Sequence, residues 1–341
     1  MTLVNKNITI TILAIICLLV LSAIPCSVFA KAPERIFYTN SAKEKEAILS
    51  IKKNYKKIDV LAPQSYVLNA NLKLVGGPSK ELKKVIKDYN FKTMPLVTNG
   101  VFEQEIIHNL LINNKAQDNF ISDLIKIAKK EKYIGWQYDF ENISYLDRDL
   151  YSLFVEKTFQ EFKNNNLILS IAVVTRLTDF EDTDAFKNWS GVFDYKRLSD
   201  SADFISVMTY DDPSSQGPVA SLPFVNSCLK YLKNKIPAEK LSLGVPLYYW
   251  SWQLNPAKKI NYGGNYNRLL DIMASNKHIT GFDATLGSAW MTYYYKNKQY
   301  AFWYTDKKTI QLRMEIIKQN NLRGFSAWVL GVEDPAIWQA I

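Results

Sequence analysis

The sequence predicts an α/β fold, a parallel (β/α)8 barrel of the TIM type with a small insertion between the seventh strand and the seventh helix. Eight short apolar runs, rich in β-branched and aromatic residues, alternate with longer amphipathic stretches. The chain has 341 residues, and a barrel of this type needs roughly 250 residues plus its insertions. Residues 253–305 break the alternation, and we expect the insertion at about these residues.

The expected strands and helices follow from this alternation. We expect the eight strands at residues 35–39, 58–66, 92–98, 133–141, 167–174, 203–211, 241–248 and 324–330. Helical patterns cover residues 43–55, 80–89, 104–111, 116–130, 147–162, 224–233 and 307–318. Ser41-Ala42-Lys43-Glu44 has the form of a capping box that opens the first helix. Pro95 is an exception, because a proline inside a strand removes a hydrogen-bond donor.

The first 30 residues have the pattern of a secretory signal peptide. Lys6 precedes an apolar run at residues 8–23, and Val28-Phe29-Ala30 offers a small-residue cleavage site. The run is shorter than the roughly 20 residues that a membrane-spanning helix needs. We therefore expect residues 1–30 to be a leader and residues 31–341 to form one catalytic barrel. That barrel would be secreted or periplasmic, with no membrane association after removal of the leader; an uncleaved anchor remains the alternative.

The composition excludes several kinds of site. His108 and His278 are the only histidines, which argues against a histidine-based zinc site and a Ser-His-Asp triad. Beyond the leader only Cys228 remains, so no internal disulfide can form. The formal net charge is +9, but its lysines are spread along the chain without a basic and aromatic block, so we expect no nucleic-acid partner. We expect a monomer without metal or cofactor, whose hydrolytic chemistry depends on carboxylates.

Carboxylates of this kind lie on the expected fourth strand. Alternate side chains of a strand share a face, so Gln137, Asp139 and Glu141 point one way. Barrel interiors are normally filled by Val, Ile and Leu, and two buried carboxylates so close together raise the pKa of at least one of them. This arrangement favours a carboxyl group that is protonated at neutral pH. A strand end paired with a lysine is the structural alternative.

The same segment resembles the signature D-G-x-D-x-D-x-E of glycoside hydrolase family 18. Gly135, Asp139 and Glu141 match, whereas Ile134 and Gln137 replace two of the acids. The resemblance implies that Glu141 is the general acid and that Asp139 holds the acetamido group of the substrate. Gln137 can donate a hydrogen bond to Asp139, but it cannot relay a proton.

Further segments resemble other motifs of this family. Met208-Thr209-Tyr210-Asp211 is similar to M-x-Y-D, residues 244–248 are similar to G-V-P-x-Y, and Ser326-Ala327-Trp328 is similar to the last strand. The resemblance implies that Tyr210 is a third catalytic residue. The substrate-binding residues that it implies are Gln137, Met208, Asp211, Tyr248 and Trp328. Burial of Tyr210 or Trp328 in the core is the alternative, and we expect Trp250, Trp252 and Trp290 near the barrel mouth, either stacking on sugars or packing.

The implied activity is that of a secreted glycosidase. It would cleave β-1,4 linkages next to N-acetylglucosamine in chitin-type polysaccharides or oligosaccharides, by the substrate-assisted retaining route that distinguishes this family. Residues 328–335 resemble the spore-germination and cell-wall branch, so a peptidoglycan N-acetylglucosaminidase is one alternative. A non-catalytic, chitin-binding barrel of the lectin kind is the other, although such members typically lack the glutamate found at position 141.

Overall fold

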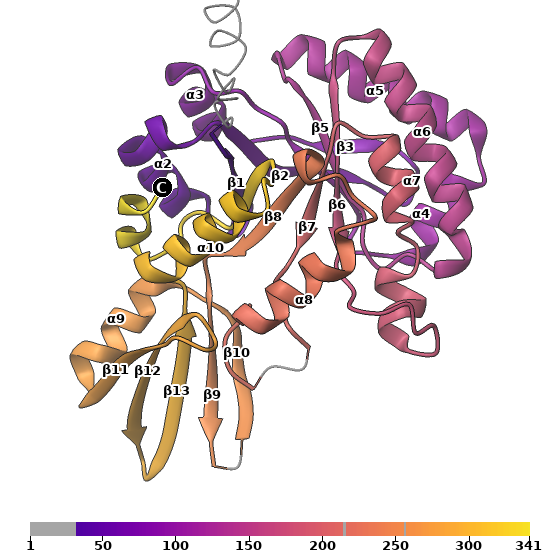
Figure 1. Ribbon diagram of the computed structural model, residues 1–341. Helices are drawn as coiled ribbons and strands as arrows, with labels where there is room; N and C mark the ends of the chain where they lie inside the picture. The colour runs from indigo at the N-terminus through magenta and orange to yellow at the C-terminus, as the bar shows by residue number, and fades with distance from the viewer. Residues whose placement is uncertain (1–31, 214–215, 256) are drawn as a thin grey trace, which may run out of the picture. The chain divides into compact units, whose positions relative to one another are not determined.

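The computed structural model describes residues 32–213, 216–255 and 257–341, so the expected leader lies outside the described residues. Eight parallel strands close into a barrel in the order β1-β14-β8-β7-β6-β5-β4-β2, and β2 pairs again with β1 (Figure 1). The predicted barrel is therefore confirmed. Its strands are β1 (Glu34–Asn40), β2 (Val60–Leu68), β4 (Leu96–Asn99), β5 (Gly135–Asp139), β6 (Ile168–Val174), β7 (Phe204–Met208), β8 (Leu241–Pro246) and β14 (Gly324–Trp328).

Each expected strand overlaps one of these strands, and Pro95 explains one shifted boundary. The strand β4 begins at Leu96, directly after the proline. The carbonyl of Pro95 accepts a hydrogen bond from the backbone N–H of Gln137 at 3.0 Å. The proline thus stands at the entrance of the strand, where its missing N–H does not interrupt the ladder. A short strand, β3 (Leu74–Gly76), pairs antiparallel with the end of β2.

Helices surround the barrel (Figure 1). They are α2 (Glu44–Asn54), α3 (Lys80–Asp88), α4 (Gln104–Leu111), α5 (Asn114–Glu131), α6 (Arg148–Asn164), α7 (Tyr195–Asp200), α8 (Leu222–Leu232) and α10 (Lys307–Gln319). The six-residue α7 was not expected from the sequence. The expected capping box at Ser41 is wrong, because the Asn40 side chain instead accepts from the Lys43 amide at 3.1 Å and a single 3-10 turn precedes α2.

The contacts of β5, the strand predicted as the fourth of the barrel, show which of its faces points toward the helices and which points into the barrel. Trp136 and Tyr138 point toward the helices: the Trp136 indole donates to the Leu124 carbonyl of α5 at 3.0 Å. Tyr138 stacks on Phe154 of α6, with ring centroids 5.6 Å apart and planes inclined by 6°. Because side chains alternate along a strand, this packing leaves Gln137 and Asp139 on the interior face of the barrel.

A five-stranded antiparallel sheet with the order β10-β9-β13-β12-β11 forms the expected insertion (Figure 1). It follows β8 and begins at Tyr249, earlier than the expected residue 253. One face is covered by the helix α9 through Leu269, Met291 and Phe302. Its elements are β9 (Tyr249–Leu254), β10 (Ala257–Gly264), α9 (Tyr266–Ser275), β11 (His278–Asp283), β12 (Ser288–Tyr295) and β13 (Lys298–Tyr304).

Of the two roles expected for the tryptophans near the barrel mouth, stacking on sugars or packing, Trp250 and Trp252 have the packing role. Trp250 is 2% exposed and Trp252 is 7% exposed, and their rings meet edge to face. The Trp252 indole donates to the Gly217 carbonyl at 2.9 Å. These side chains therefore pack the insertion against the barrel.

Among the helices of the described ranges, none has both the length and the apolar character needed to cross a membrane.

Candidate active site

A cleft of about 720 Å³ opens at the C-terminal ends of the barrel strands. This is the end at which enzymes of this architecture carry their reactive groups, and the volume suits a small ligand. Among the predicted site residues, the cleft brings together Asp139, Glu141, Met208, Tyr210, Asp211 and Trp328. The other two, Gln137 and Tyr248, lie behind this surface.

The carboxylates of Asp139 and Glu141 lie at the base of the cleft. Asp139 is the last residue of the strand and is 5% exposed, and Glu141 follows two residues later. Burial raises the pKa of Glu141 to about 8, with the charges of Asp139 and Asp211 adding to the effect. Burial also raises the pKa of Asp139 to about 6. Glu141 therefore holds its proton at neutral pH, where the Asp139 carboxyl is mostly ionised.

No cation balances this pair within the described part of the chain. None of the ion pairs found there includes Asp139 or Glu141. The alternative of a strand end paired with a lysine therefore does not describe this site. A carboxylate without a cation, removed from water, has a raised pKa, which is the state that an acid catalyst needs.

Gln64 of β2 fixes the Asp139 carboxylate. Its side-chain amide donates to Asp139 Oδ2 at 3.1 Å, and this bond counteracts part of the rise in the pKa of Asp139. Gln64 could not be recognised as a site residue from the sequence. A polar residue in a largely buried strand was the available signal, but the partner lies 75 positions away.

Asn99 of β4 fixes the backbone of Glu141 with a two-point contact. Asn99 Oδ1 accepts from the Glu141 amide at 3.0 Å, and Asn99 Nδ2 donates to the Glu141 carbonyl at 2.9 Å. Asn99 is fully buried, and the residue after the glutamate, Asn142, has a positive φ of 52°. The chain therefore turns sharply after Glu141 while Asn99 holds the peptide in place. Asn99, like Gln64, could not be recognised as a site residue from the sequence.

Gln137 lies beneath the carboxylates in a layer of neutral polar groups. The Tyr38 hydroxyl donates to Gln137 Oε1 at 2.7 Å. Gln137 Nε2 donates to the hydroxyls of Ser170 at 2.8 Å and Ser206 at 2.9 Å. Both amide hydrogens are thus engaged, so the expected hydrogen bond from Gln137 to Asp139 is wrong. Because Gln137 is fully buried, it supports the floor of the cleft and does not reach the cleft surface.

The neutral layer extends across the barrel through two further serines. Ser326 exchanges hydrogen bonds with Ser206 at 2.9 Å and with Ser242 at 2.6 Å. A layer of hydroxyl and amide groups thus replaces the aliphatic residues usual at this place. It satisfies its own hydrogen bonds and brings no compensating positive charge to Asp139.

Tyr210 lines the cleft in the loop that follows β7. Gly244 of β8 permits this position, because a Cβ there would lie 2.9 Å from the Tyr210 ring. The ring of Tyr248 contacts the Tyr210 ring edge to face, with ring centroids 6.4 Å apart. The Tyr248 hydroxyl donates a hydrogen bond to the Asp211 carboxylate. At 6% exposure Tyr248 orients Asp211 from behind and does not form part of the wall.

Trp328 is the last residue of β14, and its side chain lines the cleft. In the order of the barrel strands, β14 lies opposite β5. Its ring lies 5.7 Å from the Tyr38 ring, at an angle of 54°. Burial raises the pKa of Tyr38 to about 12, so its hydroxyl stays a donor to Gln137 at neutral pH. Tyr38 thus connects the neutral layer to the aromatic surface of the cleft.

A second cleft of about 570 Å³ begins at the same glutamate. Glu141, Met208 and Tyr210 border both clefts, so the acid stands where they meet. The far wall of the second cleft is the loop after β6, residues 175–190, which presents the partly exposed side chains Phe180 and Trp189.

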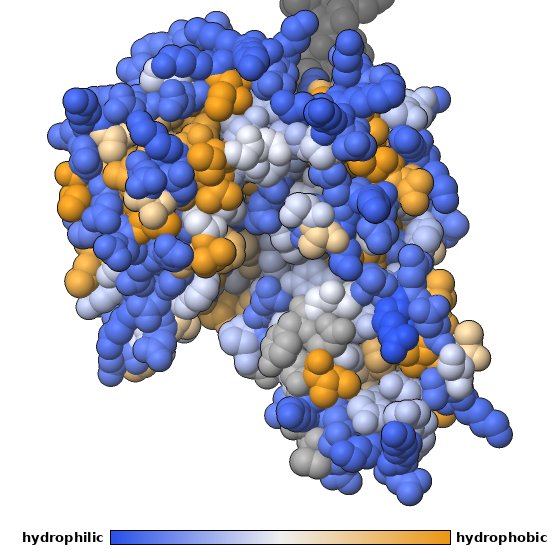
Figure 2. All heavy atoms as spheres, turned by 180° about the vertical axis from the view of Figure 1, so that it is seen from behind, coloured by the Kyte–Doolittle hydropathy of each residue, from blue (hydrophilic) through white to orange (hydrophobic). Residues whose placement is uncertain are grey.

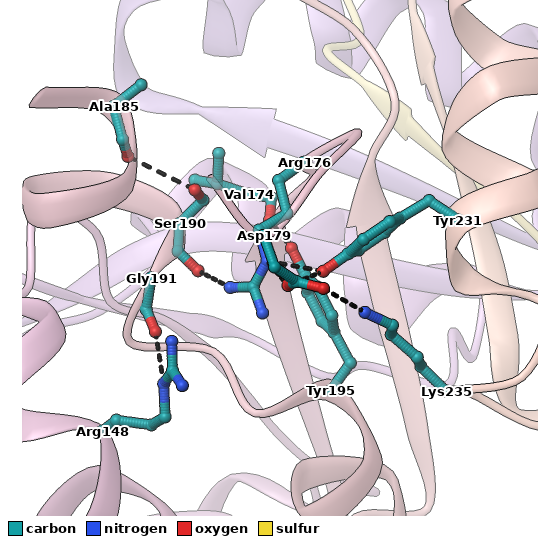
Figure 3. A network of polar contacts seen from close by, with 10 residues as sticks. All are labelled: Arg148, Val174, Arg176, Asp179, Ala185, Ser190, Gly191, Tyr195, Tyr231 and Lys235. Carbon is teal, nitrogen blue, oxygen red and sulfur yellow. Dashed lines mark hydrogen bonds and ion pairs between the residues drawn. The ribbon is translucent and has the colours of Figure 1, made fainter. Parts of the chain in front are cut away.

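Arg176 anchors this loop (Figure 3). Its Nη1 donates to the Ser190 carbonyl at 2.6 Å and its Nε donates to the Tyr231 hydroxyl at 2.8 Å. The guanidinium also lies over the Tyr195 ring at 4.8 Å and pairs with Asp179 at 3.2 Å. Figure 3 shows the Arg176 side chain, at the start of the loop, reaching the Ser190 carbonyl at its end, so that one side chain joins the two ends of the wall. Within the described ranges, no three His, Cys, Asp or Glu side chains are grouped to hold a metal ion.

Comparison with known proteins identifies relatives over most of the chain. A 302-residue match, 28% identical, covers 86% of this chain and 86% of the glycosylase YvbX of Bacillus subtilis (strain 168). A 25% match covers 80% of this chain and 65% of a cortical fragment-lytic enzyme from the same organism. A class V chitinase of Arabidopsis thaliana is 21% identical over 71% of this chain and 70% of its own length.

Solved structures share the fold. The spore cortex-lytic enzyme SleL of Bacillus megaterium QM B1551 superposes with a TM-score of 0.79 and 24% identity, over 93% of this chain and 75% of that one. A chitinase of Chromobacterium violaceum gives a TM-score of 0.79 and 21% identity, over 91% of this chain and 98% of that one. The family model described as Glycosyl hydrolases family 18 matches residues 36–333, which include the carboxylate strand and both clefts. The chain therefore belongs to glycosyl hydrolase family 18 and is a glycosidase.

Proposed function

We propose that this glycosidase hydrolyses β-1,4 bonds next to an N-acetylglucosamine residue, with Glu141 as the general acid. The position of Glu141 carries the proposal. It stands where two clefts meet, and burial keeps its carboxyl protonated at neutral pH. A sugar chain lying across both clefts would bring a glycosidic oxygen to this proton.

The proposed reaction uses the acetamido group of the substrate as the nucleophile. Glu141 gives its proton to the leaving glycosidic oxygen while the acetamido carbonyl oxygen attacks the anomeric carbon. Asp139 accepts a hydrogen bond from the acetamido N–H and stabilises the positive charge of the oxazolinium ion, and the Tyr210 hydroxyl donates to the carbonyl oxygen. Ionised Glu141 then takes a proton from water, whose oxygen opens the ring with net retention.

Two classes of glycan offer the required sugar. Chitin-type chains fit the sequence motifs, whereas the relatives named cortical fragment-lytic enzymes favour the glycan of spore cortex peptidoglycan. Incubation of the protein with chito-oligosaccharides and with purified cortex fragments, followed by mass analysis of the products, distinguishes the two. Binding to either glycan without any product would instead favour the non-catalytic, lectin-like alternative.

Substitution of Glu141 by glutamine tests the assignment. The amide keeps the shape but has no acidic proton, so we expect the turnover number to fall by about 1,000-fold while sugar binding measured by calorimetry changes little. Glu44, which lines the same cleft, provides the matched control: Glu44→Gln should keep its turnover. Undiminished turnover in Glu141→Gln would refute the role of the acid.

We also propose that the protein is secreted after cleavage of its leader. The pattern at residues 1–30 supports this proposal. Mass determination of the exported protein checks it, because cleavage after Ala30 gives a chain that begins at Lys31, and a chain that retains residues 1–30 contradicts it.

A further inference from the structure

The inserted sheet has one end whose composition differs from that of the rest of the surface. Strand register places His278, Tyr293, Tyr300, Gln253 and Lys258 in one row across all five strands. The turns β9–β10 and β12–β13 lie beyond this row. With neighbouring strands about 4.8 Å apart, the row is about 19 Å wide.

This end is strongly basic. The stretches 253–260, 277–280 and 293–300 contain five lysines and no acidic residue. Lys258, Lys277, Lys296 and Lys298 are exposed. Lys296 and Asn297 have φ of 47° and 58°, the positive values of a type I′ turn, which places Lys296 at the extremity of the sheet.

Lys258, Lys277, Lys296 and Lys298 form no ion pair with a carboxylate among the described residues. Every ion pair formed among the described residues lies outside residues 249–304. Seen from behind, hydrophilic side chains cover most of the lower part of the molecule, where the inserted sheet lies, with hydrophobic atoms between them (Figure 2). The surface therefore has the charge to attract an anionic partner.

Large apolar side chains stand exposed among the lysines. Ile279 is 67% exposed, Tyr294 is 68% exposed, Tyr295 is 50% exposed and Ile260 is 46% exposed. Each of these four residues lies one or two positions along its chain segment from a residue of the row described above. Four such side chains at one end of a sheet are unfavourable in water, and burial against an apolar phase would lower the free energy.

We infer, against the expectation from the sequence of no membrane association, that this end of the sheet docks on a membrane that contains anionic lipids. We call this end the distal edge; it is formed by Lys258, Ile260, Lys277, Ile279, Tyr294, Tyr295, Lys296 and Lys298. The lysines contact the charged headgroups, and the tyrosines and isoleucines enter the boundary between headgroups and hydrocarbon. A soluble polyanion would satisfy the lysines but would leave the isoleucines in water. The apolar side chains therefore favour a lipid surface over an anionic polymer.

Sedimentation with lipid vesicles tests this inference on the full chain. We expect binding to vesicles of phosphatidylglycerol and phosphatidylcholine, and little binding to pure phosphatidylcholine. Each lysine near an anionic surface strengthens binding by about fivefold, so the triple variant Lys277→Gln, Lys296→Gln, Lys298→Gln should bind about 100-fold more weakly. The double variant Ile279→Ser, Tyr294→Ser should bind at least about tenfold more weakly.

The matched control removes the same charge elsewhere. Lys52, Lys130 and Lys163 are exposed on α2, α5 and α6, and their triple glutamine variant should bind like the wild type. Residues 1–30 are the same in every variant, so any contribution from them cancels. Turnover of a soluble oligosaccharide should be unchanged throughout, which shows that each variant is folded.

Three results overturn the inference. The first is an equal loss of vesicle binding in the distal-edge and control lysine variants, and the second is the absence of a preference for anionic vesicles. The third is binding to soluble polyphosphate that matches vesicle binding and is unaffected by Ile279→Ser, Tyr294→Ser. That outcome would make the distal edge a site for anionic polymers.

Discussion

At the scale of single residues, the site depends on an acid whose backbone and surroundings are both fixed. Glu141 is one of the three carboxylates near the base of the cleft, and its pKa is raised by burial first and by the other two second. Asn99 holds its peptide on both sides. The side chain that reacts is thereby kept in one place, which a general acid requires.

We predict that Asn99→Ala lowers the turnover number by about tenfold with little change in KM. The alanine leaves the amide and carbonyl of Glu141 without their partner, so the carboxyl group is less well placed for the transition state while the sugar contacts remain. Steady-state kinetics on a chito-oligosaccharide measures the split. Asn40→Ala, at an asparagine that lines the cleft, is the control; a rise in KM with normal turnover in Asn99→Ala would contradict the positioning role.

The two raised pKa values predict the pH dependence of the activity. The ratio kcat/KM should fall below about pH 6, where Asp139 takes up a proton, and above about pH 8, where Glu141 loses its proton. Asp139→Asn should slow the reaction strongly. It should also move the alkaline limit of the remaining activity to lower pH, because the charge of Asp139 is one cause of the raised pKa of Glu141. An alkaline limit that does not move would show that the two groups are independent.

At the scale of elements, the strands were predictable and the contacts between them were not. Each barrel strand is a short buried run, which local pattern reveals, and alternation along β5 predicts the inward position of Asp139. Glu141 lies two residues beyond the end of β5, so the alternation of this strand does not extend to it. Gln64 of β2 binds the Asp139 carboxylate and Asn99 of β4 binds the Glu141 backbone, through hydrogen bonds that join residues 75 and 42 positions apart. A local pattern contains no information on such pairs. The start of the insertion was misplaced for a related reason, since Trp250 and Trp252 are as apolar as the end of a barrel strand.

The loop after β6 gives a prediction at this scale. Arg176→Met removes the hydrogen bonds to Ser190 and Tyr231, so residues 175–190 should become more accessible to limited proteolysis. Because this loop forms the wall of the second cleft, we expect KM for long oligosaccharides to rise several-fold with little change in turnover. Arg197→Met, which removes an exposed ion-paired arginine on α7, should behave like the wild type. Equal protease resistance in the two variants would contradict the anchoring role of Arg176.

At the scale of the whole molecule, the buried polar groups that make the site reactive also lower the stability of the folded barrel. The interior of β5 carries an amide and a carboxylate in place of aliphatic side chains, and the neutral layer below them supplies hydrogen bonds without positive charge. A protonated acid in such a place makes the stability of the folded state depend on pH. This dependence is a property of the entire chain, and it can be measured without any substrate.

The unfolding temperature of the wild type and of Glu141→Gln across pH 4 to 9 tests the central claim most directly. The folded protein holds the Glu141 proton up to about pH 8, whereas the unfolded chain releases it near the ordinary value of 4.5. The wild type should therefore lose stability relative to the glutamine variant as the pH rises between these values. We predict equal unfolding temperatures near pH 4 and a variant that unfolds several degrees higher than the wild type above pH 8. Parallel curves over the whole range would show that Glu141 ionises as in water, and would contradict its role as the proton-holding acid.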